Sequence, residues 1–122
     1  LTADEIINKA KSWLELVEQS TGRKPIIYTN ATWWKQHIGD RQDLAGYTLW
    51  VSDYSRGSLA TEMPRSPDGH EWRIWQLTDT GRIPNASIAA VDVNIFPGDH
   101  AEFNSWCCST SKQDGVTQIS DP

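Results

Sequence analysis

The fold of this chain is decided by two neighbouring stretches, WRIWQLTDTG at residues 72–81 and AAVDVNIF at residues 89–96. Both read as β-strands, because successive strand residues point to opposite faces and apolar side chains alternate accordingly. In the first, Trp72 and Gln76 are expected on one face. In the second, Asp92 is a carboxylate inside an otherwise apolar strand, and a buried charge is costly unless it is paired or used. Asp92 is therefore a candidate functional residue; the alternative is a carboxylate that hydrogen-bonds the backbone at a strand end.

The rest of the chain reads as helices and strands joined by short connections. Thr2 and Glu5 have the spacing of a capping box, and Gly22 is a suitable residue to end the helix that follows. Residues 55–71 contain several Gly and Pro residues and are expected to form a long loop. The expected helices cover about residues 3–20, 31–38 and 99–106, and the expected strands cover about residues 26–29, 48–53, 72–77 and 89–95.

The composition narrows the class of partner. The 122 residues carry a net charge of −5, which disfavours nucleic acid and anionic membrane surfaces. No apolar run approaches the roughly 20 residues of a membrane-spanning helix. Seven Trp residues are many for this length. They serve either core packing or a sugar-binding cleft, in which aromatic faces stack on sugar rings.

The two cysteines, Cys107 and Cys108, are adjacent. Neighbouring cysteines rarely bond each other, because a disulfide needs Cα atoms about 4.4–6.8 Å apart. They either pair with cysteines elsewhere or stay reduced. No group of Cys and His residues has the spacing of a zinc site, so neither a metal nor a cofactor is expected.

Four segments carry a resemblance to a known family. They are Gly22–Thr29, Leu49–Tyr54, the Trp75-Gln76 pair followed by Gly81, and Val91–Phe96. In this order they resemble the C-terminal signature of the family 25 glycoside hydrolases, the Chalaropsis-type lysozymes. The resemblance spans about residues 13–96, which is most of the chain.

The resemblance implies an α/β fold, the second half of a TIM-like (β/α)5(β)3 barrel with four strands and two main helices. This half-barrel is expected in residues 1–106, and the polar residues 107–122 are expected to be a disordered tail. Active sites of such barrels lie at the carboxyl ends of the strands. Half a barrel also leaves two unpaired strand edges, at residues 26–29 and 89–95.

The resemblance also implies a reaction and a set of site residues. The family hydrolyses the β-1,4 bond between N-acetylmuramic acid and N-acetylglucosamine in peptidoglycan. Asp92 matches the supporting acid on the family's last strand. Asp53 and the three histidines match no functional position. The residues expected to line the sugar cleft, with packing as the alternative for several, are Tyr28, Trp50, Tyr54, Gln76 and, at the same strand ends, Asn94.

The family's principal acids are missing from the chain. They form an Asp-x-Glu motif at the end of the fourth strand, which is expected to fall just before Leu1. The chain alone is therefore expected to be inactive. The resemblance also implies a location outside the cell, in the periplasm or at the cell wall, where the family acts. Three interpretations stay open: one piece of a lysozyme that acts on peptidoglycan strands, a non-catalytic glycan-binding module, or an interaction protein. In the last case the open edges pair in a homodimer or with a chain that supplies the first four strands.

Overall fold

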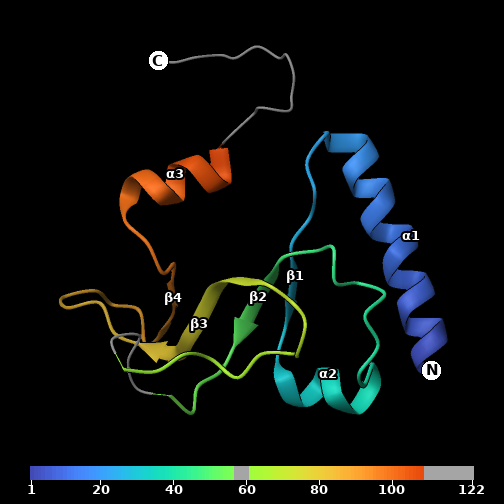
Figure 1. Ribbon diagram of the computed structural model, residues 1–122. Helices are drawn as coiled ribbons and strands as arrows, with labels where there is room; N and C mark the ends of the chain where they lie inside the picture. Colours follow the sequence, from blue (N-terminus) through green and yellow to red (C-terminus); the bar gives the residue numbers. More distant parts are fainter. Residues whose placement is uncertain (57–60, 109–122) are drawn as a thin grey trace.

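Four strands form one mixed sheet with three helices around it in the computed structural model, which describes residues 1–56 and 61–108 (Figure 1). The strand order is β1-β2-β3-β4; β1, β2 and β3 are parallel, and β4 is antiparallel to β3. This confirms the expected α/β fold with four strands. The elements are α1 (Ala3–Thr21), β1 (Ile27–Thr29), α2 (Ala31–His37), β2 (Leu49–Ser52), β3 (Trp72–Gly81), β4 (Val91–Ile95) and α3 (His100–Cys108).

The helix ends are set by local side-chain chemistry. The Thr2 hydroxyl accepts a hydrogen bond from the Glu5 amide, and the Glu5 carboxylate accepts one from the Thr2 amide, so the capping box is confirmed. Gly22 ends α1 in the left-handed conformation, with φ of 72°, which a residue without a Cβ adopts at little cost. The Asn30 side chain caps α2 by accepting from the Trp33 amide at 2.8 Å.

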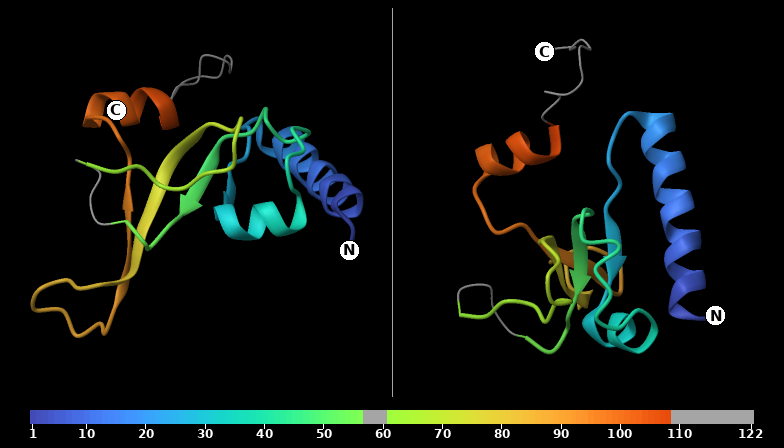
Figure 2. Two further views of the ribbon diagram at one scale, coloured as in Figure 1. Left: turned by 60° about the horizontal axis from the view of Figure 1, so that its bottom comes forward. Right: turned by 45° about the vertical axis from the view of Figure 1, so that its right-hand side comes forward.

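The hydrophobic core lies between one face of the sheet and the helices α1 and α2, which flank the β1 side of the sheet (Figure 2). Leu49 and Val51 of β2 are fully buried on this face. Their neighbours Trp50 and Ser52 alternate with them and remain partly exposed on the other face. The core cluster consists of Ile7, Leu14, Trp34, Ile38, Leu44, Leu49 and Val51.

Helix α3 packs at the end of the sheet where β1 and β3 begin. The Arg23 guanidinium donates a hydrogen bond to the Cys107 carbonyl at 3.0 Å. Arg73, near the start of β3, lies over the Trp106 ring at 6.0 Å. Phe96, directly after β4, stacks on Trp106 with ring centroids 5.4 Å apart. The opposite end of the sheet, where β1, β2 and β3 finish, is not covered by α3 (Figure 1).

Several boundaries differ from the expected ones. β3 runs to Gly81, four residues farther than expected, because it pairs with β4 in a long hairpin. Trp72 packs against the core cluster and not on the face of Gln76, because the β2–β3 register shifts between Leu49 and Trp50. α3 continues to Cys108, so two residues of the expected tail are helical, and residues 109–122 lie outside the described residues.

Two further expectations concern loops and membranes. The described residues of the expected 55–71 loop form neither helix nor strand, and residues 57–60 of it lie outside the described part of the chain. Among the described helices, none has both the length and the apolar character that crossing a bilayer requires.

Candidate functional site

Gln76 is the centre of a hydrogen-bond network on the face of the sheet opposite the core. Its side-chain oxygen accepts a hydrogen bond from the Tyr28 hydroxyl at 2.7 Å and a second one from the Tyr54 hydroxyl. Its amide nitrogen lies 3.4 Å from a carboxylate oxygen of Asp92. Gln76 is only 4% exposed, because these side chains surround it. Three different strands and one loop thus meet at one amide group.

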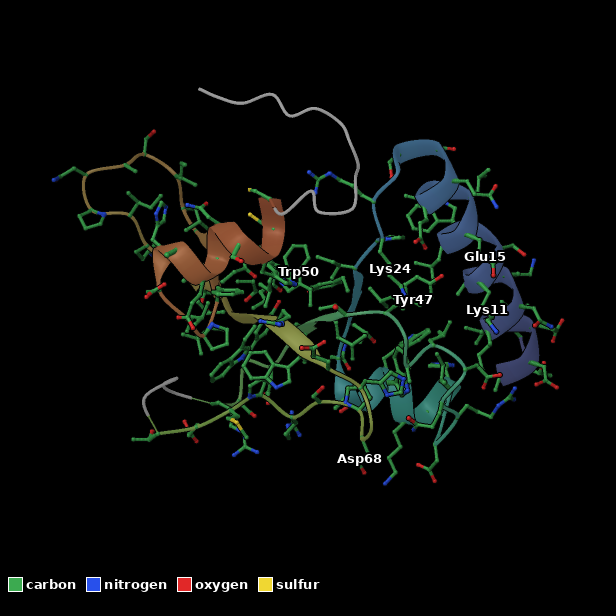
Figure 3. The ribbon with its side chains drawn as sticks, turned by 45° about the horizontal axis from the view of Figure 1, so that its top comes forward. Lys11, Glu15, Lys24, Tyr47, Trp50 and Asp68 are labelled. Carbon is green, nitrogen blue, oxygen red and sulfur yellow. The ribbon has the colours of Figure 1, made fainter. Side chains whose placement is uncertain are left out.

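A second set of contacts extends the network across the same face. Tyr28 and Trp50 are paired neighbours on β1 and β2, and their rings meet edge to face with centroids 4.9 Å apart. The Trp50 indole N–H donates to the Asn94 side-chain oxygen at 2.7 Å. Figure 3 shows Trp50 on the side of the sheet away from α1. We refer to the residues on this face as the open-face row: Tyr28, Trp50, Tyr54, Gln76, Asp92 and Asn94.

The position of Asp92 differs from the sequence-based expectation in two ways. Asp92 is exposed and not a buried charge, because β4 is an edge strand and no helix of the described residues covers the open face. Asp92 also lies near the start of β4, whereas the family resemblance places site residues at the carboxyl ends of strands. It still reaches the carboxyl ends of the other strands, because β4 runs antiparallel to β3 and Asn94 pairs with Gln76.

The electrostatics of the row keep Tyr54 protonated. Desolvation of its hydroxyl, the neighbouring Tyr28 phenol and the charges of Asp79 and Asp92 raise the pKa of Tyr54 to about 12. At neutral pH Tyr54 is therefore a neutral phenol that donates to Gln76. The row combines aromatic surface with hydroxyl, amide and carboxylate groups, which is the chemistry that recognises a polyhydroxylated ligand.

A buried carboxylate next to this row had no role in the sequence-based interpretation. Asp53, directly after β2, is 4% exposed and accepts hydrogen bonds from Ser55 and Arg65. Burial alone would raise the pKa of Asp53, but these hydrogen bonds outweigh it and hold that pKa well below its usual range. One signal was available: the alternation along β2 places Asp53 on the buried side, with Leu49 and Val51.

Asp53 also lines a hollow of about 290 Å³ at the same end of the sheet. The other lining residues come from the ends of β1 and β2, the first turn of α2 and Arg65: Asn30, Ala31, Thr32, Ser52, Tyr54, Ser55 and Arg65. The hollow therefore adjoins the open-face row through Tyr54.

The described residues contain no group of three or more Cys, His, Asp or Glu side chains that could hold a metal ion. Cys107 and Cys108 are both free thiols at the end of α3, with their sulfur atoms 2.8 Å apart. Cys107 hydrogen-bonds Cys108, and this contact together with burial raises the pKa of the Cys107 thiol. The hydrogen bonds described for these two cysteines join them to each other and to Arg23, and not to the open-face row.

Comparison with known proteins gives a consistent result. The family model described as glycosyl hydrolases family 25 matches residues 1–86. The chain is 35% identical over 112 residues to the uncharacterized protein YegX of Escherichia coli K12. This match covers 87% of this chain and 36% of YegX. It is 34% identical over 93 residues to Lysozyme M1 of Streptomyces globisporus, covering 75% of this chain and 30% of that lysozyme.

Solved structures agree with these relatives. A bacterial lysozyme from Streptomyces coelicolor superimposes with a TM-score of 0.74 and 26% identity, over 86% of this chain and 46% of that one. A muramidase from Acremonium alcalophilum gives a TM-score of 0.69 at 25% identity, with the same coverage. The chain spans about a third of the length of the curated relatives and about half of these solved chains. Gln76 lies inside the range matched by the family model, and Asp92 and Asn94 lie beyond it.

Proposed function

This chain belongs to glycosyl hydrolase family 25, and from that premise we propose that it forms one wall of a lysozyme active site. The bond cleaved is the β-1,4 linkage between N-acetylmuramic acid and N-acetylglucosamine in peptidoglycan, at the cell wall. The chain supplies the glycan-binding wall and one supporting carboxylate. It does not supply the principal acid of the reaction.

The observation that carries this proposal is the convergence of the open-face row on Gln76. Tyr28 and Trp50 offer aromatic surface for the apolar faces of sugar rings. The two tyrosine hydroxyls retain acceptor lone pairs for sugar hydroxyl groups while they donate to Gln76. Asp92, exposed beside them, contributes a negative charge that favours the positive charge developing on the sugar ring during cleavage.

The carboxyl groups of the row support the proposal that the isolated chain is inactive. Glycosidases of this type use two carboxyl groups, one of which protonates the leaving oxygen. Asp92 is the one carboxylate in the open-face row, and no Asp-x-Glu triplet occurs in the sequence. A missing general acid removes about 10²–10⁴-fold of the rate.

We expect the 122-residue chain to bind cell walls without degrading them. The chain is incubated with insoluble peptidoglycan, the bound fraction is measured after sedimentation, and turbidity is followed over time. Tyr28→Ala should reduce the bound fraction, because it removes an aromatic surface and one hydrogen bond to Gln76. Trp13→Ala is the matched control: Trp13 lies on α1, is 60% exposed, and faces away from the row.

The outcomes separate the possible roles. If the wild-type chain and the Tyr28→Ala variant sediment with peptidoglycan to the same extent, the open-face row is not a glycan-binding wall. Turbidity clearance above buffer that persists in Asp92→Asn would show a mechanism other than the family's. Clearance that is lost in Asp92→Asn would mean that Asp92 itself acts as a catalytic residue.

The alternative function is a half-barrel that binds another chain and not a glycan. The observation that favours it is that β1 and β4, at the two ends of the sheet, have no further strand neighbour in the part of the chain that the structure describes. It predicts a chain that does not sediment with peptidoglycan and that forms a stable complex through those edges.

A further inference from the structure

Asp53 is a buried charge that the proposed glycan wall does not use directly. Its side chain is 1% exposed. A carboxylate in such a position is costly unless its oxygens are hydrogen-bonded and its charge is compensated. Both conditions are met by residues that follow β2 in the sequence.

The carboxylate joins two points of the chain that are ten residues apart. One oxygen accepts from the Ser55 amide at 3.0 Å and from the Ser55 hydroxyl at 2.6 Å. The other accepts from the Arg65 amide at 2.8 Å. The Arg65 guanidinium reaches both oxygens at 3.3 Å, and the Arg56 guanidinium lies 3.7 Å away. Asp53 thus holds both ends of the 55–65 segment against the end of β2.

The backbone of Asp53 is attached to the sheet at the same time. Its amide donates to the Gln76 carbonyl at 3.1 Å, and its carbonyl accepts from the Trp75 indole at 2.9 Å. Tyr54 lies between this anchored residue and the anchored Ser55. Tyr54 is 48% exposed, so little packing holds its ring, and its contact with Gln76 depends on where its backbone is held.

We propose that Asp53 is a positioning residue of the glycan-binding wall, whose ionised carboxylate holds Tyr54 in hydrogen-bond contact with Gln76. This inference rests on the proposed function for its consequence, which is tighter glycan binding. The contact between Tyr54 and Gln76 exists without any ligand, so the positioning role has its own measurement.

The first test compares Asp53→Asn with the matched control Asp43→Asn, which removes an exposed carboxylate paired with Arg41. Nuclear Overhauser contacts between the Tyr54 ring and the Gln76 side-chain amide are measured in the free 122-residue chain. We expect these contacts to be lost in Asp53→Asn and kept in Asp43→Asn. Contacts that survive in a folded Asp53→Asn chain would overturn the proposal, whatever the chain binds.

The second test measures affinity for a soluble β-1,4-linked N-acetylglucosamine tetramer by titration calorimetry. Asp53→Asn should weaken binding by up to about tenfold, the upper size of one lost hydrogen bond between neutral groups such as Tyr54 and Gln76. In a Tyr54→Phe background the same substitution should cause no further loss, because both changes remove one contact. Additive losses would mean that Asp53 acts through the fold as a whole and would overturn the proposal.

Failure of the proposed function gives a different pattern. A wild-type chain that does not bind the tetramer, but whose Tyr54–Gln76 contacts disappear in Asp53→Asn, rejects the glycan wall and keeps the positioning role. If Asp53→Asn does not fold, Ser55→Ala replaces it, because that change removes one hydrogen bond to the carboxylate and leaves its charge paired with Arg65. It should weaken the Tyr54–Gln76 contacts in the same direction, and unchanged contacts would overturn the proposal.

Discussion

Gln76 organises the candidate site because its amide group is almost fully occupied by protein partners. An amide oxygen has two lone pairs, and here the hydroxyls of Tyr28 and Tyr54 use both. One amide proton faces Asp92. Gln76 therefore orients its neighbours, and the atoms left to contact a ligand are the phenol oxygens and the Asp92 carboxylate.

Asp92 should act through its charge and not through its volume. In a complete family 25 enzyme that contains this half, we expect Asp92→Asn to lower turnover on the order of 100-fold, the size typical of losing one electrostatic contact to a transition state. The thermal unfolding midpoint should stay unchanged, because the substitution removes a charge and leaves the side-chain volume almost the same. Asp40→Asn, which changes an exposed carboxylate outside the row, is the control for turnover.

The opposite result would identify a structural residue. If Asp92→Asn unfolds at a much lower temperature and its turnover per folded molecule is normal, the carboxylate stabilises the fold and its assignment to the site is wrong.

At the scale of elements, α1 buries the leucine that lies on its apolar stripe and exposes the one that lies on its opposite face. Leu14 is 3% exposed in the core cluster, whereas Leu16, two residues farther along the same helix, is 60% exposed. Two residues correspond to about 200° around a helix, so the two side chains point in nearly opposite directions. The hydrophobic stripe of α1 packs against the sheet, and its other face meets solvent.

This difference predicts two unequal substitutions of the same residue type. Leu14→Ala should reduce the free energy of unfolding by about 2–5 kcal/mol, because it leaves a cavity in the core. Leu16→Ala should change it by no more than about 0.5 kcal/mol. Urea unfolding followed by far-ultraviolet circular dichroism measures both. Equal losses would mean that the outer face of α1 is covered in solution.

At the scale of the whole molecule, the sheet built by residues 1–56 and 61–108 has two open edges and one open face. Within these residues, β1 and β4 each have a single strand neighbour. Such edges recruit other strands. Because β4 runs antiparallel to β1, β2 and β3, its edge would meet the β1 edge of a second copy in antiparallel fashion. Two copies related by a two-fold axis would then form a closed ring of eight strands.

We therefore expect a homodimer, or a stable complex with a chain that supplies the other four strands. Light scattering of the 122-residue chain at micromolar concentration should give the mass of two chains. Val93→Lys, which puts a charge on the β4 edge, should return the particle to one chain, because charged edge residues oppose strand pairing. A monodisperse wild-type particle with the mass of one chain contradicts this expectation.

The sequence alone was sufficient for the elements, the fold class and the family. Strand alternation, the Thr2–Glu5 capping box and the cap at Gly22 are local signals, because each depends on residues within a few positions of one another. The family resemblance rested on short motifs in a fixed order, and the match over residues 1–86 confirms it. It also named the six residues that the structure brings together on one face, while their role in binding stays a prediction.

Tertiary structure decided the direction of β4, the exposure of Asp92 and the anchoring role of Asp53. Strand direction depends on which partner a strand pairs with, and the alternation of apolar and polar residues in Val91–Ile95 is the same in either direction. The exposure of Asp92 depends on what covers the open face, and the residues near Asp92 in the sequence do not determine that. The charge compensation of Asp53 depends on Arg65, twelve residues farther along the sequence, whose amide and guanidinium both contact the Asp53 carboxylate. Contacts between distant residues decide these three features, and a pattern of neighbours contains no information about them.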